Sequence, residues 1–231
     1  MQERTFRGIV PLERASTVDR VTEMLRDELL SGRLAPGTTL QEIPLATALR
    51  VSRNTLREAV RTLVAEGLLT RTPHKGIVIS NLTPADVDEL FEVRELLESA
   101  ALEKACAMRS GILPILNEKI EGLRRAMAAG NERSIVEMDL AFHQALLSAL
   151  GSTRLQHFHA VLISELRLAL AVLDRDGGGA SIKQMVAQHQ QIVAAIKTGN
   201  VARSQQLLLR HLRDSKDRLK SLLRQRENKD K

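Results

Sequence analysis

From residue 82 onwards, apolar residues recur every three or four positions in long stretches that glycines separate. The first stretch begins with Thr83-Pro84, a capping residue followed by proline at the first helical position, and its period continues through Met108. The later stretches and the breaks between them are 112–129, 132–150, 153–174, 180–198 and 200–226, with breaks at Gly111, Gly130, Gly151, Gly177-Gly178-Gly179 and Gly199. This pattern predicts an antiparallel six-helix bundle with short loops.

The first 80 residues consist of shorter elements. Residues 17–34 and 41–50 show helical spacing, and Ser52 caps a third helix that ends at Glu66-Gly67. Two short runs, "LLTR" and "GIVIS", then flank the turn-rich segment "TPHKG", which predicts a small β-hairpin. The chain is therefore predicted to be mostly α.

The distribution of charge supports two domains, residues 1–80 and 81–231. Residues 1–80 carry 12 Lys/Arg against 9 Asp/Glu, a balance of +3, whereas residues 81–200 carry 12 against 15, a balance of −3. A basic N-terminal block favours a polyanionic partner. Residues 201–231 carry 10 against 4, and this basic end is either a second anion contact or a solvated helix C-terminus.

The composition favours helices and a cytoplasmic location. Because the sequence has no Trp or Tyr and only 4 Phe, its core must be built mainly from aliphatic side chains. The lone Cys106 excludes an internal disulfide and suits a reducing compartment. The charged N-terminus lacks the apolar segment of a secretory signal, and no apolar run approaches the roughly 18–20 residues of a membrane span. We therefore expect no membrane partner.

The third helix of the N-terminal domain has one apolar and one polar arc when its residues are placed at 100° steps. The apolar arc consists of Leu56, Ala59, Val60, Leu63 and Val64. The polar arc consists of Asn54, Arg57, Glu58 and Arg61, with Arg53 at its edge. Arginine can donate two hydrogen bonds to guanine, asparagine can pair with adenine, and threonine can contact a phosphate or a thymine methyl group.

These features predict a winged helix-turn-helix that binds double-stranded DNA. The candidate DNA-binding residues are Ser52, Arg53, Asn54, Thr55 and Arg57 at the start of the helix, and His74, Lys75 and Gly76 at the hairpin tip. The helix N-terminus also offers free N–H groups to phosphate. The alternative is a solvated helix face whose charges pair within the helix, as Arg57, Arg61 and Glu58 would.

The segment "GTTLQEIPLATALRVSRNTLREAVRTLVAEGLLTRTPHKGIVIS" resembles the winged helix-turn-helix of GntR-family transcriptional regulators, and the resemblance covers roughly residues 15–80. It implies that Arg53, Thr55 and Arg57 contact the operator and that the tip at His74-Lys75-Gly76 enters the minor groove. Many members carry arginine directly after the glutamate that corresponds to Glu42, whereas this chain has Ile43. The apolar side chain of Ile43 cannot make the DNA contact that an arginine would make at this position.

Four polar residues interrupt the predicted apolar stripes of the bundle: Asp139, His143, His189 and His211. Burial of such a group without a partner costs about 1–3 kcal/mol. The cost is avoided if the aspartate and the three histidines lie close together inside the bundle. Together they could bind Zn²⁺, Ni²⁺ or Mn²⁺. The alternative for any single histidine is an ordinary core residue with a satisfied hydrogen bond.

Arg94 lies on the apolar stripe of the first bundle helix. Facing a metal-lined cavity, it would bind a carboxylate effector together with the ion; the alternative is an intrahelical pair with Glu95 or Glu98. His157 and His159 fall outside the stripe formed by Leu155, Phe158, Leu162 and Leu166, and are predicted to lie on the surface.

The second domain, at about residues 84–215, is similar to the all-helical ligand-binding domain (FCD type) of the FadR subfamily. In metal-containing members, an Asp-x-x-x-His pair and two later histidines bind a divalent ion. The segments "MDLAFHQAL", "AQHQQIVAAI" and "LLLRHLRDS" stand in those places. Six helices resemble the variant whose members often take small carboxylate effectors.

The leading interpretation is that the protein is a ligand-responsive repressor. It would bind an inverted-repeat operator as a homodimer. Within this interpretation, the ion is either the signal itself or a fixed platform for a carboxylate. A metal-dependent hydrolase is the alternative from another class. The sequence has no His-Glu-x-x-His motif, and catalysis in the bundle would leave the winged helix unexplained.

Overall fold

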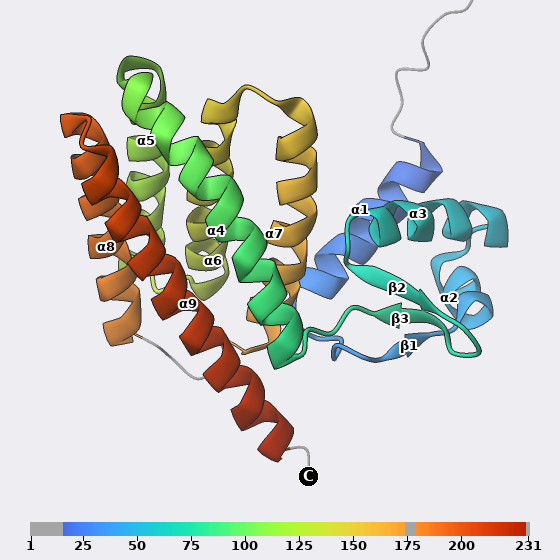
Figure 1. Ribbon diagram of the computed structural model, residues 1–231. Helices are drawn as coiled ribbons and strands as arrows, with labels where there is room; N and C mark the ends of the chain where they lie inside the picture. Colours follow the sequence, from blue (N-terminus) through green and yellow to red (C-terminus); the bar gives the residue numbers. More distant parts are fainter. Residues whose placement is uncertain (1–15, 174–178, 230–231) are drawn as a thin grey trace, which may run out of the picture.

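The computed structural model describes residues 16–173 and 179–229. Figure 1 shows two parts side by side, a small N-terminal part that contains the sheet and a larger bundle of helices. The mostly α fold with a small antiparallel sheet is confirmed. Expectations for residues 1–15 and the predicted break at Gly177-Gly178 lie outside the described residues.

The N-terminal part contains the three predicted helices and the hairpin. Its elements are α1 (Thr17–Leu30), β1 (Thr39–Leu40), α2 (Glu42–Leu49), α3 (Arg53–Ala65), β2 (Leu69–Thr72) and β3 (Gly76–Ile79). The side chain of Ser16 accepts a hydrogen bond from the backbone N–H of Asp19, and the Asp19 carboxylate accepts one in return, so α1 begins with a capping box. Helices α2 and α3 are joined by a short turn in which Arg50 adopts a left-handed conformation.

The sheet has three antiparallel strands in the order β1-β3-β2. Strand β1 corrects the sequence interpretation, which treated the chain before the second helix only as a turn. Thr39 pairs with Val78 and Leu40 with Ile77. A strand of two residues carries no periodic signal, and the hydrogen bonds that define it come from a segment almost forty residues away.

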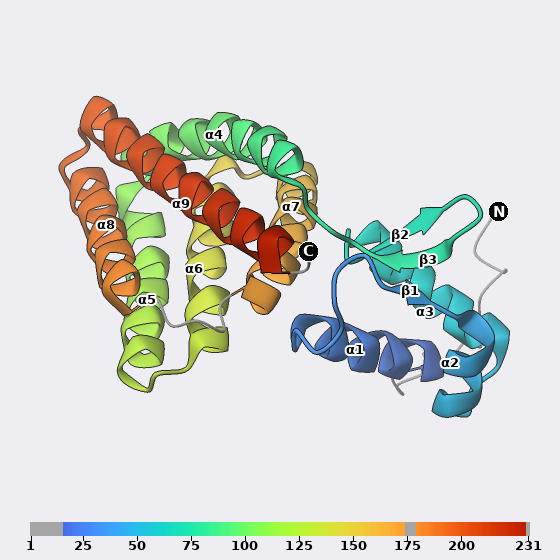
Figure 2. The same ribbon diagram turned by 90° about the horizontal axis from the view of Figure 1, so that it is seen from below.

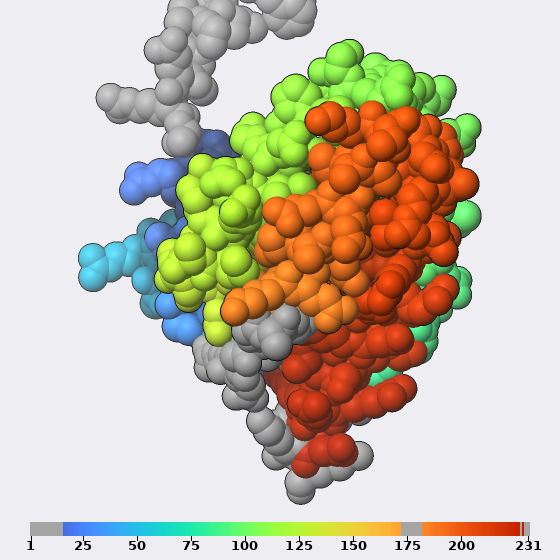
Figure 3. Space-filling view, turned by 90° about the vertical axis from the view of Figure 1, so that its left-hand side faces the viewer, coloured from blue at the N-terminus to red at the C-terminus, as the bar shows by residue number. Residues whose placement is uncertain are grey.

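Helices α4 to α9 form the predicted bundle. Their bounds are α4 (Pro84–Ala107), α5 (Arg109–Ala128), α6 (Glu132–Leu147), α7 (Thr153–Leu173), α8 (Gly179–Thr198) and α9 (Val201–Lys229), with a short 3-10 helix η1 (Ser148–Leu150) after α6. Figure 2 shows α9 crossing the bundle beside α4, and Figure 3 shows α5, α6, α8 and α9 packed together on the face turned away from the sheet. Within the described ranges, no helix combines the length and apolarity that a bilayer crossing requires.

One predicted helix break is displaced. The chain turns at Met108, whose backbone is not helical, and Gly111 lies inside the first turn of α5 instead of between two helices. Gly130, Gly151 and Gly199 do follow helix ends with positive φ angles of 61°, 66° and 72°. These glycines relieve the steric cost of the left-handed conformation that ends each helix.

The winged-helix core includes one residue from the bundle. Leu168 of α7 is 2% exposed and packs with the apolar residues of α1, α3, β2 and β3. Close by, a Cβ atom at Gly67 would lie 2.9 Å from the Glu165 side chain, so α7 approaches the end of α3 closely. A further ion pair joins Arg133 of α6 to Asp27 of α1 at 3.3 Å. The two parts therefore share a packed interface centred on α7.

We expect Leu168→Ala to lower the free energy of unfolding by about 2–5 kcal/mol, because it leaves a cavity in the winged-helix core. Chemical denaturation followed by circular dichroism would measure the change. Leu96→Ala on α4 is the matched control, since that side chain is 74% exposed and its truncation should cost less than about 0.5 kcal/mol. Equal stability of both variants would contradict the shared core.

Candidate metal centre and nucleic-acid interface

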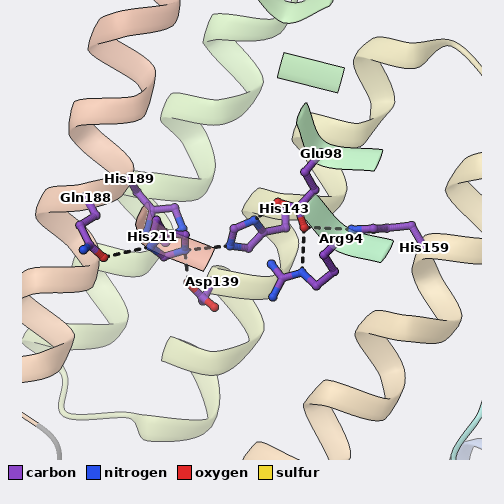
Figure 4. A network of polar contacts seen from close by, with 8 residues as sticks. All are labelled: Arg94, Glu98, Asp139, His143, His159, Gln188, His189 and His211. Atoms are coloured by element: carbon purple, nitrogen blue, oxygen red, sulfur yellow. Dashed lines mark hydrogen bonds and ion pairs between the residues drawn. The ribbon is translucent and has the colours of Figure 1, made fainter. Parts of the chain in front are cut away.

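The four predicted metal ligands come together inside the bundle. Asp139 and His143 lie on α6, His189 on α8 and His211 on α9, and one ligand atom from each lies within 4.8 Å of the others (Figure 4). The three histidines are at most 1% exposed, while Asp139 is half-buried. The helical spacing places Asp139 and His143 one turn apart on the same face of α6.

Hydrogen bonds fix the orientation of each imidazole. His143 Nδ1 donates to Glu98 Oε2 at 2.7 Å, and His189 Nδ1 donates to the Met185 carbonyl at 2.9 Å. His211 Nδ1 donates to Gln188 Oε1 at 3.0 Å. The amide of Gln188 is itself oriented, because its Nε2 donates to Asp214 Oδ2 at 2.7 Å.

These bonds place the proton of each neutral ring on Nδ1 and leave a lone pair on Nε2. The Nε2 atoms of His143 and His211 face each other at 3.2 Å, yet neither carries a proton to share in this tautomer. His189 Nε2 and Asp139 Oδ1 are buried without a hydrogen-bond partner and lie 3.3 Å apart. Three lone pairs and a carboxylate oxygen directed at one point repel one another, and a divalent cation would remove that repulsion. The residues present therefore fit a metal ion.

Burial keeps the imidazoles of His189 and His211 uncharged. It lowers the pKa of His189 to about 4, although the neighbouring Asp139 carboxylate acts in the opposite direction. Burial and the nearby His189 hold the pKa of His211 well below its usual range. At neutral pH both rings are in the deprotonated form that metal coordination requires.

Glu98 connects the four-residue cluster to two further helices. Its carboxylate is fully buried and contacts Arg94 Nε at 2.8 Å, His143 Nδ1 at 2.7 Å and His159 Nε2 at 3.3 Å. Burial by itself would raise the pKa of Glu98, but the Arg94 guanidinium and His143 hold it well below its usual range. Glu98 is therefore ionised and serves as the acceptor that orients His143.

Arg94 lines a cavity together with Asp139 of the cluster. It makes the intrahelical pair with Glu98, and its Nη2 atom is buried without a hydrogen-bond partner. The cavity measures about 70 Å³ and is lined by apolar side chains together with Arg94, Asp139, Ser215 and Arg218. The alternative of an intrahelical pair is thus present through Nε, while Nη2 has unused hydrogen-bonding capacity.

The prediction for His159 was wrong. His159 is 0% exposed and points into the bundle toward Glu98, whereas Phe158 is 64% exposed (Figure 4). In the first half of α7 the inward stripe is shifted by one residue from the predicted one, from Phe158 and Leu162 to His159 and Ile163, whereas Leu166 is buried as predicted. The buried carboxylate of Glu98 supplies the partner that makes an inward histidine favourable. His157 is exposed, as predicted.

Sequence reasoning missed the residues that orient the ligands, chiefly Glu98 and Gln188. The sequence predicts Glu98 only as an intrahelical partner of Arg94. Gln188 precedes His189, and neither periodicity nor motif spacing distinguishes it from a surface glutamine. A usable signal was present for Glu98, because it lies one turn after Arg94 on the same inward stripe.

The predicted DNA-binding residues lie on α3 and at the tip of the β2-β3 hairpin. Arg53, Asn54 and Arg57 are exposed, and Thr55 is half-buried. Ser52 caps α3 by accepting from the Thr55 N–H at 3.0 Å, and the two hydroxyls lie 2.8 Å apart. These two residues therefore fix the start of the helix that presents the arginines.

Glu42 of α2 orients Arg57 of α3. Its carboxylate contacts Arg57 Nε at 2.8 Å and Arg71 of β2 at 3.8 Å, which joins both helices and the hairpin at one point. No periodic or motif signal in the sequence marks this bridge. The next residue, Ile43, is 62% exposed. An apolar side chain therefore occupies the surface position at which the family resemblance leads us to expect arginine.

At the hairpin tip, His74 has a φ of 65° and Gly76 a φ of 80°, and both are exposed together with Lys75. The left-handed conformations bend the chain sharply between Thr72 and Gly76, which pair with each other. A Cβ atom at Gly76 would meet nothing within 4 Å, so the backbone there is open to a partner. The described surface thus presents cations from α3 and the tip.

Comparison with known proteins agrees with both parts of the structure. Residues 17–79 match the family "Bacterial regulatory proteins, gntR family", and residues 89–214 match the FCD domain. An uncharacterized HTH-type transcriptional regulator of Bacillus subtilis is 28% identical over 86% of this chain and 89% of its own length. The gluconate operon transcriptional repressor of the same organism is 27% identical over 91% of this chain and 88% of its own. A GntR transcriptional regulator from Rhodococcus sp. RHA1 has a similar structure, with a TM-score of 0.75, 27% identity, and coverage of 89% of this chain and 98% of the other.

A winged helix followed by a helical bundle of this kind defines a DNA-binding transcriptional regulator with a separate sensing domain. The chain belongs to the GntR family of bacterial regulatory proteins, in the group with an FCD domain. It is a regulator and not an enzyme, which removes the hydrolase alternative.

We expect Glu98→Ala to destabilise the protein by about 3–5 kcal/mol after treatment with a chelator, because Arg94 would remain buried without a counter-charge. Urea denaturation would measure the loss. Glu103→Ala, at an exposed position on the same helix, should have little effect. If the two variants unfolded at the same urea concentration, the buried network would not have the structural role assigned to Glu98.

Proposed function

We propose that the protein is a cytoplasmic repressor that binds an inverted-repeat operator as a homodimer and responds to a small carboxylate bound at a divalent metal ion. The observation that carries the sensing half of this proposal is the meeting of three imidazole Nε2 atoms and one carboxylate beside the unpartnered Nη2 of Arg94. The exposed arginines on α3 carry the DNA-binding half.

The start of α3 has the chemistry of a recognition helix. Arg53, Asn54 and Arg57 project from its first two turns, where they can reach base edges in a major groove. Ser52 and Thr55 lie at the helix N-terminus, where phosphate binding is favourable. His74, Lys75 and Gly76 extend the contact to the adjacent groove.

Repression is supported by the names of the relatives. The Bacillus subtilis relative is named a repressor of the gluconate operon, and the galactonate operon repressor of Escherichia coli is 25% identical over 88% of this chain. A two-fold dimer would place two copies of α3 at half-sites one helical turn apart or a multiple of it.

The four-residue cluster would hold the metal ion through Asp139, His143, His189 and His211. Imidazole-rich donor sets suit Zn²⁺ and Ni²⁺ better than Mn²⁺, although all three accept nitrogen and oxygen ligands. A bound ion supplies a fixed positive charge that attracts a carboxylate. Arg94 borders the same cavity as Asp139, so its Nη2 would bind one effector oxygen.

Arg57→Ala should weaken operator binding by about 1–3 kcal/mol, because it removes a base-edge contact. Fluorescence anisotropy with an operator duplex at fixed salt concentration would measure the affinity. Arg124→Ala removes the same charge from an exposed position on α5 and should leave the affinity unchanged. Full affinity in Arg57→Ala would show that this residue does not read the operator.

Native mass spectrometry of protein purified without chelator or nickel resin should find one divalent ion per chain, and His143→Ala should lose it. The exposed His157→Ala is the control. Metal binding that survives His143→Ala would refute the site.

Gln188→Leu should weaken metal binding about 10–100-fold by removing the acceptor that orients His211, whereas the exposed Gln190→Leu should not. If the metal but no carboxylate altered DNA affinity, the ion itself would be the signal.

A further inference from the structure

A second cavity lies between the two parts of the molecule. It measures about 370 Å³ and is bordered by the end of α1 on one side and by α6 and α7 on the other. Figure 1 shows the C-terminal end of α1 beside α7, and the two helices are in contact. Its charged lining residues are Arg33, Glu132, Arg133, Glu137 and Arg167.

This interdomain cavity adjoins the cavity at the metal ligands. Val136 of α6 and Leu170 of α7 line both spaces, so the two cavities are neighbours. Both residues are half-buried and apolar. The smaller space, with about 70 Å³, can receive a carboxylate group but leaves little room for the remainder of a ligand.

Arg167 is the arginine of this lining that lacks a counter-charge among the described residues. Arg33 pairs with Glu28, and Arg133 pairs with Glu137 at 3.1 Å and with Asp27 at 3.3 Å. The Nε atom of Arg167, by contrast, is buried without a hydrogen-bond partner. Glu132 is exposed in the first turn of α6, where the helix dipole already stabilises its charge.

Adjoining cavities thus contain two arginines with buried, unsatisfied donors, Arg94 at one end and Arg167 at the other. An unsatisfied buried donor is costly, and a charged acceptor in the right place recovers that cost. We propose that the effector carries two anionic groups, one at the metal ion and Arg94 and the other at Arg167 in the interdomain cavity. This inference rests on the proposed function, since it assumes that a carboxylate binds at the metal site.

A ligand of this shape would also contact the DNA-binding part. The interdomain cavity includes Leu30, Ser31 and Arg33 at the end of α1, so the outer part of the ligand lies against both parts at once. Its binding free energy then differs between arrangements in which α1 and α7 are close and those in which they are apart. That difference is the requirement for a ligand to shift the population of one arrangement.

Isothermal titration calorimetry of the full chain loaded with Zn²⁺ would test the proposal. The probes are unbranched dicarboxylates from malonate to pimelate, each compared with the monocarboxylate of the same carbon number. We expect at least one dicarboxylate to bind about tenfold more tightly than its monocarboxylate. Arg167→Gln should abolish that difference and leave monocarboxylate binding unchanged, which also shows that the variant is folded. Arg154→Gln, at an exposed position in the first turn of α7, is the control and should retain the difference.

The outcomes separate this inference from the proposed function. Monocarboxylate binding without any advantage for a dicarboxylate, or an advantage that persists in Arg167→Gln, would overturn the role of Arg167 and leave the metal-bound carboxylate intact. Zn²⁺ binding without binding of any carboxylate would overturn both the inference and the carboxylate effector.

Discussion

A carboxylate without access to water organises the sensing domain. Glu98 of α4 receives hydrogen bonds from Arg94 on its own helix, from His143 on α6 and from His159 on α7. A buried charge is tolerated only when its partners are well placed, so the network sets how these helices are positioned against one another. The same network determines the tautomer of His143 and hence the direction of its lone pair. The helical packing and the proposed metal chemistry therefore depend on one residue.

The sequence predicted the elements well where the signal is local. Caps at Ser52 and Thr83 and the glycines at positions 130, 151 and 199 mark helix ends through backbone chemistry that needs no distant partner. Strand β1 was missed because its definition depends on hydrogen bonds with β3. Local reasoning cannot supply a contact between segments that are far apart in the chain.

The candidate site shows the same division. Asp139, His143, His189 and His211 could be identified because polar residues interrupt apolar stripes, a feature visible in the sequence itself. His159 could not, because its inward orientation depends on Glu98 from another helix, and an apolar stripe on α7 can be drawn equally well through Phe158. On the proposed DNA-binding face, the exposure of Arg57 was predicted, but its ion pair with Glu42 was not. Periodicity identifies which residues face inward or outward more reliably than it identifies their partners.

Leu168 makes the boundary between the two parts unusual. It belongs to a helix of the sensing domain, yet its side chain completes the core of the winged helix. Separating the parts would transfer this side chain to water at a cost of about 1.5–3 kcal/mol, and the winged helix would retain a hole. Close-packed cores do not deform gradually. Small tilts of the DNA-binding part are therefore disfavoured compared with two states, one in which Leu168 is fully packed in the winged-helix core and one in which it has left that core. The molecule would then respond to its effector in discrete steps, and the threshold for a step would be set by one apolar side chain remote from the effector, the ion and the DNA.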